Sequence, residues 1–565
     1  MPAAVAVAAH LALALGVLAI VGHTLVTDAG QLTGDFRTDA MYIAQQAHGL
    51  QQNHLPSLFL TYDLAAFYPI FTFYGGTFFT FTGLIALLLG SAMTAEVVVI
   101  LMGLAAAYGG WYWLARLAGV RPWPAHAPAI VYVTAPYLVT NVYVRHDLPE
   151  QVATSFIPLL VASAISVAKA KSWPAWPTVA FAASVVVFGG THNLTLLWGT
   201  TILVIVGLLV ATVVPAARAL VTRAGLLRLA IVAVPALLLN AWFLLPDLVY
   251  GSHTVIAHRL PEWKAALHES HPELGLARLA APHRFDLSSG GGYALPALAL
   301  TWTAVAAIVA GGRRRGSWGR LLALAWIVTG VLAVVIAHPT SLLVLPDPWL
   351  LLQGSARLCT YATFGVACAV IAALRMTDRV RGWFVLLLPA CLLAGGVLAV
   401  VQMQHMPRLA GFADPIEKTL SVSIGDYGDG RSRSLGDEIA SAPYVGFARS
   451  DVRGNVADIA MPYRDGAIVR TNLLVPAELL RIRGAHVIGR WPAEGLLPGS
   501  PVRWYLAIQI ADQGVDGQAH VVISATRAWP LVVGKILSLL GVLGLVAVAV
   551  TLGRRRHGGR TPLVV

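Results

Sequence analysis

Charged residues are scarce in this chain. Asp, Glu, Lys and Arg make up 12% of its 565 residues, whereas hydrophobic residues make up 57%. Soluble globular domains usually carry about 25% charged residues, so the composition excludes an ordinary soluble protein. The apolar content also excludes a disordered chain, and the Gly residues show no period of three, which excludes a collagen-like chain. The sequence therefore predicts a polytopic membrane protein.

The chain also has few cysteines and lacks the common nucleotide-binding motifs. The three cysteines, Cys359, Cys368 and Cys391, lie in apolar stretches, so we expect no disulfide framework. The sequence contains no P-loop, no Gly-rich dinucleotide fingerprint and no Gly-x-Ser-x-Gly elbow. ATP-driven or nicotinamide chemistry is therefore not expected, and any reaction must start from a substrate that is already activated.

Basic residues outnumber acidic ones, 39 to 27, which gives a net charge of +12. In a soluble protein this balance would suggest nucleic acid as a partner. Here the basic residues fall in short runs between apolar segments, a pattern typical of cytoplasmic membrane loops. We therefore expect membrane lipids, and no nucleic acid, as partners.

The apolar segments predict an all-α membrane part with about twelve transmembrane helices. The first, Ala3 to Val26, lacks a basic n-region and is predicted as a span, not a cleaved signal peptide. We interpret Gly75 to Met93 as a helix in the outer interface. The predicted spans are 3–26, 94–115, 124–144, 150–168, 176–190, 194–213, 226–247, 293–311, 319–337, 355–374, 383–402 and 531–552.

Lys and Arg bias then sets the orientation, because basic loops stay in the cytoplasm. With a cytoplasmic N-terminus, every basic loop and the basic C-terminal tail fall on the cytoplasmic side of a bacterial cytoplasmic membrane. The predicted division is a transmembrane domain over 1–402, an extracytoplasmic domain over 403–530, and a last helix with its tail over 531–565. The outer loops of the transmembrane domain are 27–93, 145–149 and 248–292. Alternating apolar residues and Asp-Gly turns predict that 403–530 is a small β-rich domain.

Acidic residues point to a candidate site. Asp35, Arg37 and Asp39 open the first outer loop, where a carboxylate can serve as a base or a metal ligand. The alternative is a solvated turn in which Asp caps a helix.

A second group of polar residues lies in two other outer turns. Arg145, His146, Asp147 and Glu150 share one short turn, which could hold a phosphate, a metal or a sugar hydroxyl. An internal ion pair in a capped turn is the alternative. The pair His192-Asn193 could bind a substrate or simply cap a helix. The His residues of 248–292 match no zinc spacing, so a metal there is not expected.

The order of these features resembles the GT-C superfamily of membrane glycosyltransferases. A long outer loop opening with Asp follows the first span, and a short acidic outer turn follows later. The chain is more closely similar to the bacterial YfhO-like and 6-pyruvoyl-tetrahydropterin synthase-related membrane proteins. The segments that carry this similarity are Asp39 through His54-Leu55-Pro56, Phe73 to Gly76, Arg145 to Glu150, Thr191 to Thr195 and Arg470 to Leu474.

The resemblance implies a membrane glycosyltransferase that moves a sugar from a polyprenyl-phosphate donor to a glycan or lipid acceptor. It makes Asp39 the first choice for the catalytic base and Asp35 the second. Asp147 and Glu150 would bind substrate or a divalent metal, Mg²⁺ or Mn²⁺, and Arg145 would pair with the donor phosphate. The spacing Asp-x-x-Glu departs from the tight Asp-x-Glu pair of the oligosaccharyltransferase branch, which leaves metal dependence open.

Two other functions stay open. A glycolipid transporter or flippase would use the same membrane part, although no two related halves are visible in the sequence. A non-catalytic envelope-assembly protein could keep a GT-C-like scaffold without its chemistry. The enzyme hypothesis requires Asp35 or Asp39, Arg145 and Glu150 to converge on one cavity.

Overall fold

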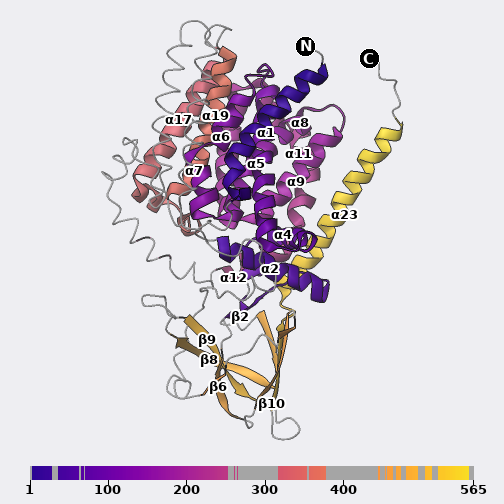
Figure 1. The fold of residues 1–565 in the computed structure, drawn as a ribbon, viewed down its shortest axis with the longest axis vertical. Coiled ribbons are helices and arrows are strands. Elements are labelled where there is room, and N and C mark those ends of the chain that lie inside the picture. The colour runs from indigo at the N-terminus through magenta and orange to yellow at the C-terminus, as the bar shows by residue number, and fades with distance from the viewer. Residues whose placement is uncertain are drawn as a thin grey trace.

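The computed structural model shows a helical part and a smaller β part, joined end to end (Figure 1). The described residues are 3–27, 36–62, 65–68, 70–251, 260, 264, 316–352, 355–376, 443–445, 452–453, 455–461, 466–471, 479–493, 503–511 and 519–558. The predicted spans 293–311 and 383–402, as well as Asp35, lie outside them.

Helices dominate the described chain. The first half contains α1 (Ala3–Thr27), α2 (Phe36–Asn53), α3 (Ile70–Phe73), α4 (Gly76–Leu89), α5 (Ala92–Leu117), α6 (His126–Val133), α7 (Pro136–Thr140), the π-helix η2 (Asn141–Arg145), α8 (Leu148–Lys169), α9 (Ala175–Thr191), α10 (Asn193–Val213), the 3₁₀ helix η3 (Pro215–Val221), α11 (Arg223–Leu238) and α12 (Ala241–Tyr250). Further along the chain are α17 (Ser317–Ala337), η6 (Pro339–Val344), α18 (Asp347–Leu350), η7 (Ser355–Leu358), α19 (Cys359–Met376) and α23 (Trp529–Gly558).

Seven of the described helices are long and apolar enough to cross a membrane, namely α1, α5, α8, α10, α17, α19 and α23. The pair α11 and α12 makes an eighth candidate, bent by 74°. The predicted span 124–144 is divided among α6, α7 and η2, because Pro136 cannot continue α6. The chain is thus a multi-pass membrane protein, and the count of twelve spans stays a prediction.

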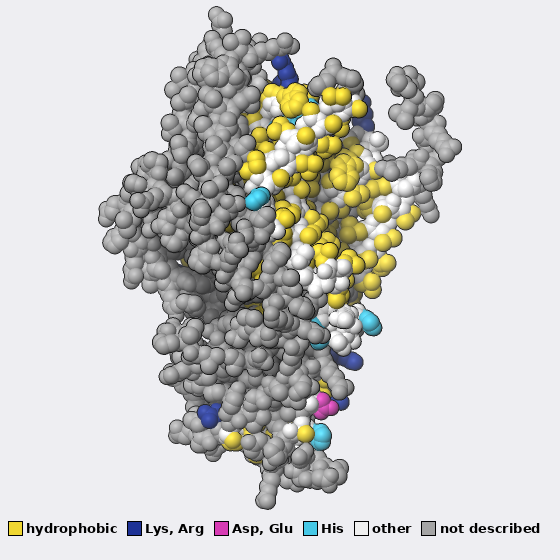
Figure 2. All heavy atoms as spheres, in the orientation of Figure 1, with side chains coloured by type: hydrophobic (Ala, Val, Ile, Leu, Met, Phe, Trp, Pro, Cys, Tyr) yellow, Lys and Arg dark blue, Asp and Glu magenta, His cyan; other side chains and the backbone are white. Residues whose placement is uncertain are grey.

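Large apolar side chains on the outside of the helical part fit a lipid surface. Leu15 of α1 is 64% exposed, and Leu539 of α23 is 59% exposed. Figure 2 shows hydrophobic side chains gathered over the described helices. Soluble proteins rarely expose a patch of this extent to water, so these faces are expected to contact acyl chains.

Helix α4 occupies most of the segment predicted to lie in the outer interface, and that placement stays a prediction. Its 14 residues span about 21 Å, which is less than the roughly 30 Å hydrocarbon core. The residue that precedes the helix, Gly75, has a left-handed φ of +55°, which favours glycine. It packs on α2, α5 and α9 at the end of the helical part nearest the strands (Figure 1).

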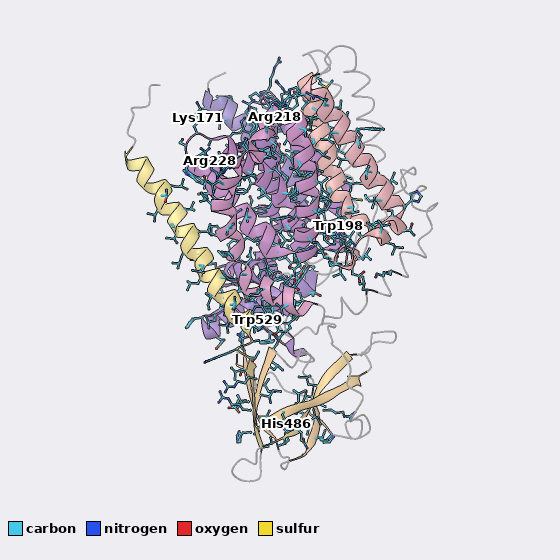
Figure 3. The ribbon with its side chains drawn as sticks, turned by 180° about the vertical axis from the view of Figure 1, so that it is seen from behind. Lys171, Trp198, Arg218, Arg228, His486 and Trp529 are labelled. Atoms are coloured by element: carbon cyan, nitrogen blue, oxygen red, sulfur yellow. The ribbon has the colours of Figure 1, made fainter. Side chains whose placement is uncertain are left out.

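The two chain ends lie at the opposite end of the helical part from the strands (Figure 1). Lys171, Arg218 and Arg228 lie at that same far end (Figure 3). This clustering agrees with one basic face, which the positive-inside rule would put in the cytoplasm. The orientation in the membrane remains a prediction.

The β part is built from two sheets. One four-stranded sheet has the order β4-β5-β10-β7 and the other has the order β3-β6-β9-β8. The strands are β3 (Tyr444–Val445), β4 (Val452–Arg453), β5 (Val456–Met461), β6 (Ile468–Thr471), β7 (Leu480–Arg483), β8 (Ala485–Ala493), β9 (Arg503–Ile510) and β10 (Ala519–Ala525). β8 and β9 pair antiparallel, with His486 opposite Gln509 and Trp491 opposite Tyr505, and a bulge between Val487 and Gly489. The strand-like runs seen in the sequence at 503–508 and 520–524 fall in β9 and β10.

One hydrophobic core joins both sheets to the first outer loop. Val469 and Ile508 come from one sheet and Val521 from the other, and all three are buried together with Leu58 and Phe59. Beside them the hairpin β1 (Leu60–Tyr62) and β2 (Ala65–Tyr68) extends the loop. The Leu58 backbone N–H also donates to Asn455 Oδ1 at 3.0 Å. The β part is therefore fixed to the chain segment that follows α2.

Helix α23 packs against the break between α11 and α12. The Trp242 backbone N–H donates to Ser538 Oγ at 2.9 Å, and that hydroxyl donates to the Leu238 carbonyl at 3.2 Å. Ser538 thereby satisfies backbone groups that the bend leaves without helical partners, which a membrane interior requires. Gly541 lies so close that a Cβ there would meet the Leu239 nitrogen at 2.6 Å.

We expect Gly541→Leu to lower the thermal stability of the purified protein, because overpacking costs about 1–3 kcal/mol. Gly553→Leu in the same helix is the matched control, since a Cβ at Gly553 meets nothing within 4 Å. The measurement is the midpoint of thermal unfolding in detergent. Equal midpoints for the two variants would contradict close packing of α23 on the bend.

Candidate active site

Four segments from distant parts of the sequence meet at the end of the helical part that faces the strands. Asp147 caps the N-terminus of α8, where its side chain accepts the Glu150 backbone N–H at 3.1 Å. His192 caps α10, where its Nδ1 accepts the Thr195 backbone N–H at 3.1 Å. η7 contributes Arg357, and the first turn of α2 contributes Asp39. Helix capping thus explains locally why Asp147 and His192 are held at helix ends.

Arg357 lies at the centre of this site. Its Nη1 is 2.6 Å from Glu150 Oε2, 3.2 Å from Asp147 Oδ2 and 3.2 Å from His192 Nε2. All four side chains are at most 9% exposed. A guanidinium shared by two buried carboxylates is a strong charge-assisted arrangement, and it leaves the cluster with one excess negative charge when both acids are ionised.

Two tyrosine hydroxyls also contact the carboxylates of the cluster. The Tyr137 hydroxyl donates to Glu150 Oε1 at 2.7 Å, and the Tyr74 hydroxyl lies 3.4 Å from Asp147 Oδ1. Tyr74 belongs to the Phe73-to-Gly76 segment, so a residue before α4 reaches the turn before α8. The site therefore draws on the first outer loop as well as the second.

Asp39 lies against the same turn. Its Oδ2 accepts the Leu148 backbone N–H at 3.3 Å, and its side chain is 2% exposed. Leu148 follows Asp147 directly, so one peptide unit separates the residue that contacts Arg357 from the residue that contacts Asp39. Carboxylates of the first and second outer loops thus meet at one turn, although Asp39 and Asp147 line neither of the two hollows described below.

His146 is hydrogen-bonded to groups other than Arg357. Its Nδ1 donates to the Val142 carbonyl at 2.7 Å and its Nε2 lies 2.7 Å from Glu96 Oε1. Burial lowers the pKa of His146 below its ordinary value. The structure therefore places His146 behind the site, bonded to protein groups on both ring nitrogens, and not among the residues that face Arg357.

Asn193 also turns to protein partners. Its amide donates to the Phe73 carbonyl at 2.6 Å and to Asp247 Oδ2 at 2.7 Å. The backbone of Arg37 lies in α2 and that of Arg145 ends η2, but their side chains are outside the described part of the structure.

The donor atoms of Asp147, Glu150 and His192 lie within 4.8 Å of one another, which is a spacing that could hold a metal ion. In this arrangement, however, Arg357 Nη1 contacts all three side chains. A divalent cation would have to displace the guanidinium to reach them. The donor set as arranged therefore fits an internal arginine and not a metal.

Two hollows adjoin the cluster. A small polar pocket is lined by Glu150, Thr154, His192, Leu194, Thr195, Trp198, Leu352, Arg357 and Tyr361. An apolar hollow between α8, α10, α17 and α19 is lined by Ile157, Ile202, Leu203, Val206, Val210, Leu321, Leu324, Ala325, Val328, Tyr361, Phe364, Gly365 and Cys368. Tyr361 lines both, so the charged cluster and the apolar hollow are neighbours. Trp198, on the wall of the polar pocket, is marked in Figure 3.

Sequence reasoning missed Arg357 and Glu96. Each is a charged residue within a predicted span, 355–374 and 94–115 respectively. Charged residues inside membrane segments are rare and are functional candidates by default, so their positions were the available signal. The pairing itself could not be foreseen, because Arg357 meets Glu150 across 207 residues.

The fold and the site define a multi-pass membrane protein with a buried carboxylate–arginine cluster beneath a small β part. No protein-family model matches the chain, and no curated protein matches it. Two solved structures are similar to it. ArnT from Cupriavidus metallidurans, bound to undecaprenyl phosphate, is 14% identical, with a TM-score of 0.30 over 66% of this chain and 77% of that chain.

The second structure is the arabinofuranosyltransferase AftD from Mycobacteria. It is 13% identical, with a TM-score of 0.37 over 87% of this chain and 41% of that chain. Both TM-scores are below 0.5, so these similarities do not show which reaction the chain performs.

Proposed function

We propose that this protein is a membrane glycosyltransferase. It would move a sugar from a polyprenyl-phosphate donor to a cell-envelope glycan or lipid acceptor at the outer face of the bacterial cytoplasmic membrane. The observation that carries the proposal is the convergence of Asp39 with the Asp147–Glu150–Arg357 cluster. An apolar hollow opens beside that cluster.

Each part of this arrangement suits one requirement of sugar transfer. Asp39 accepts the proton of the acceptor hydroxyl while that oxygen forms a bond to the anomeric carbon. The bond from the anomeric carbon to the phosphate oxygen breaks, and the lipid phosphate leaves with the electron pair. Arg357 is the buried cation of this cluster. It would stabilise the leaving phosphate, because its fork geometry suits phosphate oxygens. The apolar hollow would take part of the prenyl chain.

Neither alternative function accounts for the same residues as well. An envelope-assembly protein without chemistry would have no need to bury three acids from two loops beside one arginine, because buried charges are costly to maintain. A glycolipid transporter could use the apolar hollow but would not require a base beside the cluster. The enzyme hypothesis is therefore the one we propose.

A transfer assay tests the proposal. Purified protein in liposomes is given a panel of polyprenyl-phosphate sugars with a glycan or lipid acceptor, and release of lipid phosphate is measured. Stoichiometric lipid phosphate and glycosylated acceptor are expected. Movement of the donor across the bilayer without acceptor, together with no lipid phosphate, would instead identify a transporter.

Sugar transfer is expected not to require a divalent metal. Because Arg357 contacts the three donor side chains, chelation with EDTA should leave the transfer rate nearly unchanged, and added Mg²⁺ or Mn²⁺ should not stimulate it. The measurement is the initial rate before and after chelation. Loss of transfer on chelation, with recovery on adding Mn²⁺, would assign Asp147, Glu150 and His192 to a metal that displaces the guanidinium.

A further inference from the structure

A fully buried pair, Glu96 of α5 and His146, lies behind the candidate site. Glu96 is 0% exposed and His146 is 1% exposed, and the 2.7 Å contact joins Glu96 Oε1 to His146 Nε2. The second carboxyl oxygen of Glu96, Oε2, is buried with no hydrogen-bond partner in the described part of the structure. A carboxyl group that is half unsatisfied in a helix crossing the membrane is costly, so its contact with His146 has to offset that cost.

The proton count of the pair follows from the other ring nitrogen. The Val142 carbonyl can only accept, so His146 Nδ1 carries a hydrogen. A neutral ring then has a bare lone pair at Nε2, and the bond to Glu96 needs a hydrogen on the carboxyl oxygen. If the ring is charged instead, the carboxyl is ionised. In both cases one proton lies between the two groups and the pair is electrically neutral, which suits its burial.

The pair holds a backbone conformation that is unfavourable by itself. His146 has a φ of +55°, a left-handed value that costs a non-glycine residue energy. It directly follows the π-helix η2, and its N–H donates to the Asn141 carbonyl at 2.9 Å. Strained residues of this kind persist only when their surroundings fix them, and here the ring is fixed by Glu96 and Val142.

His146 also contacts the helix that carries Asp39. The ring of Phe36 packs edge-on against the His146 ring, with centroids 4.7 Å apart and an interplanar angle of 83°. Phe36 starts α2, three residues before Asp39, and His146 directly precedes Asp147. One imidazole thus connects α5, the start of α2 and the turn before α8.

We propose that Glu96 is a positioning residue for the candidate active site: it fixes the His146 ring, which sets the turn that presents Asp147 to Arg357 and the Leu148 N–H to Asp39. This role rests on the proposed sugar transfer. Glu96 itself contacts no substrate, and its effect passes through His146. Removing it releases the turn, and the two carboxylates lose their common alignment.

The test uses three substitutions in the full-length protein. Glu96→Leu removes the hydrogen bond, whereas Glu96→Gln keeps a donor that can reach Nε2. Tyr108→Phe is the control. Tyr108 lies on the same helix as Glu96, about 18 Å further along α5, and the substitution removes a buried hydroxyl contact to His126. Backbone hydrogen exchange over 36–40 and 141–151 is measured by mass spectrometry, together with kcat and KM for transfer.

In Glu96→Leu we expect exchange at the 146–148 amides to rise about tenfold or more, as local opening becomes easier. We expect kcat to fall about 100-fold, with KM changed much less, because misalignment by about 1 Å costs roughly that factor. Glu96→Gln should restore both readouts, and Tyr108→Phe should alter neither. Unchanged exchange and unchanged kcat in a folded Glu96→Leu variant would overturn the role.

A second variant covers the case in which Glu96→Leu does not fold. His146→Gly suits the positive φ and removes the ring, so the backbone conformation is retained at lower cost. Faster exchange over 146–148 and a lower kcat in this variant support the pair as the fixing element, whereas wild-type values refute it. If the wild-type protein transfers no sugar, the proposed function fails, and the exchange measurements still decide the positioning role.

Discussion

Asp39→Asn is expected to reduce the rate of sugar transfer about 1,000-fold, within the range that loss of a general base gives. Asn cannot accept the acceptor's proton, but its Oδ1 can still accept the Leu148 N–H that Asp39 accepts at 3.3 Å. The fold should therefore survive while the chemistry fails. The measurement is the rate of lipid-phosphate release, compared with the thermal unfolding midpoint of the same preparation.

Asp247→Asn is the matched control for this experiment. Asp247 is a partly buried carboxylate that accepts the Asn193 amide at 2.7 Å. Loss of its charge should leave transfer nearly unchanged. A well-folded Asp39→Asn variant that transfers sugar at the wild-type rate would remove Asp39 from the role of base, and Asp35 would become the candidate to test.

The membrane class could be predicted from the sequence because long apolar runs with few charges are stable mainly in a lipid bilayer. Gly75 to Met93 was predicted not to span because a span there would invert the orientation of every later basic loop, and the structure has a helix of 14 residues within that segment. The division of 124–144 into α6, α7 and η2 could not be predicted, since a single internal Pro can kink, break or be tolerated in a membrane helix. Which of these outcomes occurs depends on the neighbouring groups that hydrogen-bond to the backbone groups freed by the Pro.

The candidate site was predictable in part. The acids Asp39, Asp147 and Glu150 stood out because so few carboxylates occur, and the structure brings them together. The direction of the His146 side chain was not predictable, because it depends on a left-handed φ that no sequence pattern indicates. Arg357 was hidden for a different reason, since its partners lie far earlier in the chain, Glu150 by 207 residues, and only the fold places them in contact.

Arg357→Met is the second change for which we expect a large effect. Met keeps much of the length but removes the charge shared by Glu150 at 2.6 Å and Asp147 at 3.2 Å. Breaking a buried ion pair from one side costs about 3–5 kcal/mol, because the remaining charges are left uncompensated. We therefore expect a clearly lower unfolding midpoint, and transfer reduced by at least about 100-fold, as expected for loss of a group that stabilises developing charge.

The double variant Arg357→Met with Glu150→Gln separates these two effects. Neutralising Glu150 removes one of the two uncompensated negative charges and so restores the net charge of the wild-type cluster, and a Gln side chain can still accept the Tyr137 hydroxyl that Glu150 accepts at 2.7 Å. Stability should therefore return toward the wild-type value. Transfer should not return, because no cation remains beside the leaving phosphate. Recovery of transfer together with stability would mean that Arg357 only balances the charge of Glu150 and Asp147, and that the leaving phosphate is stabilised by another group.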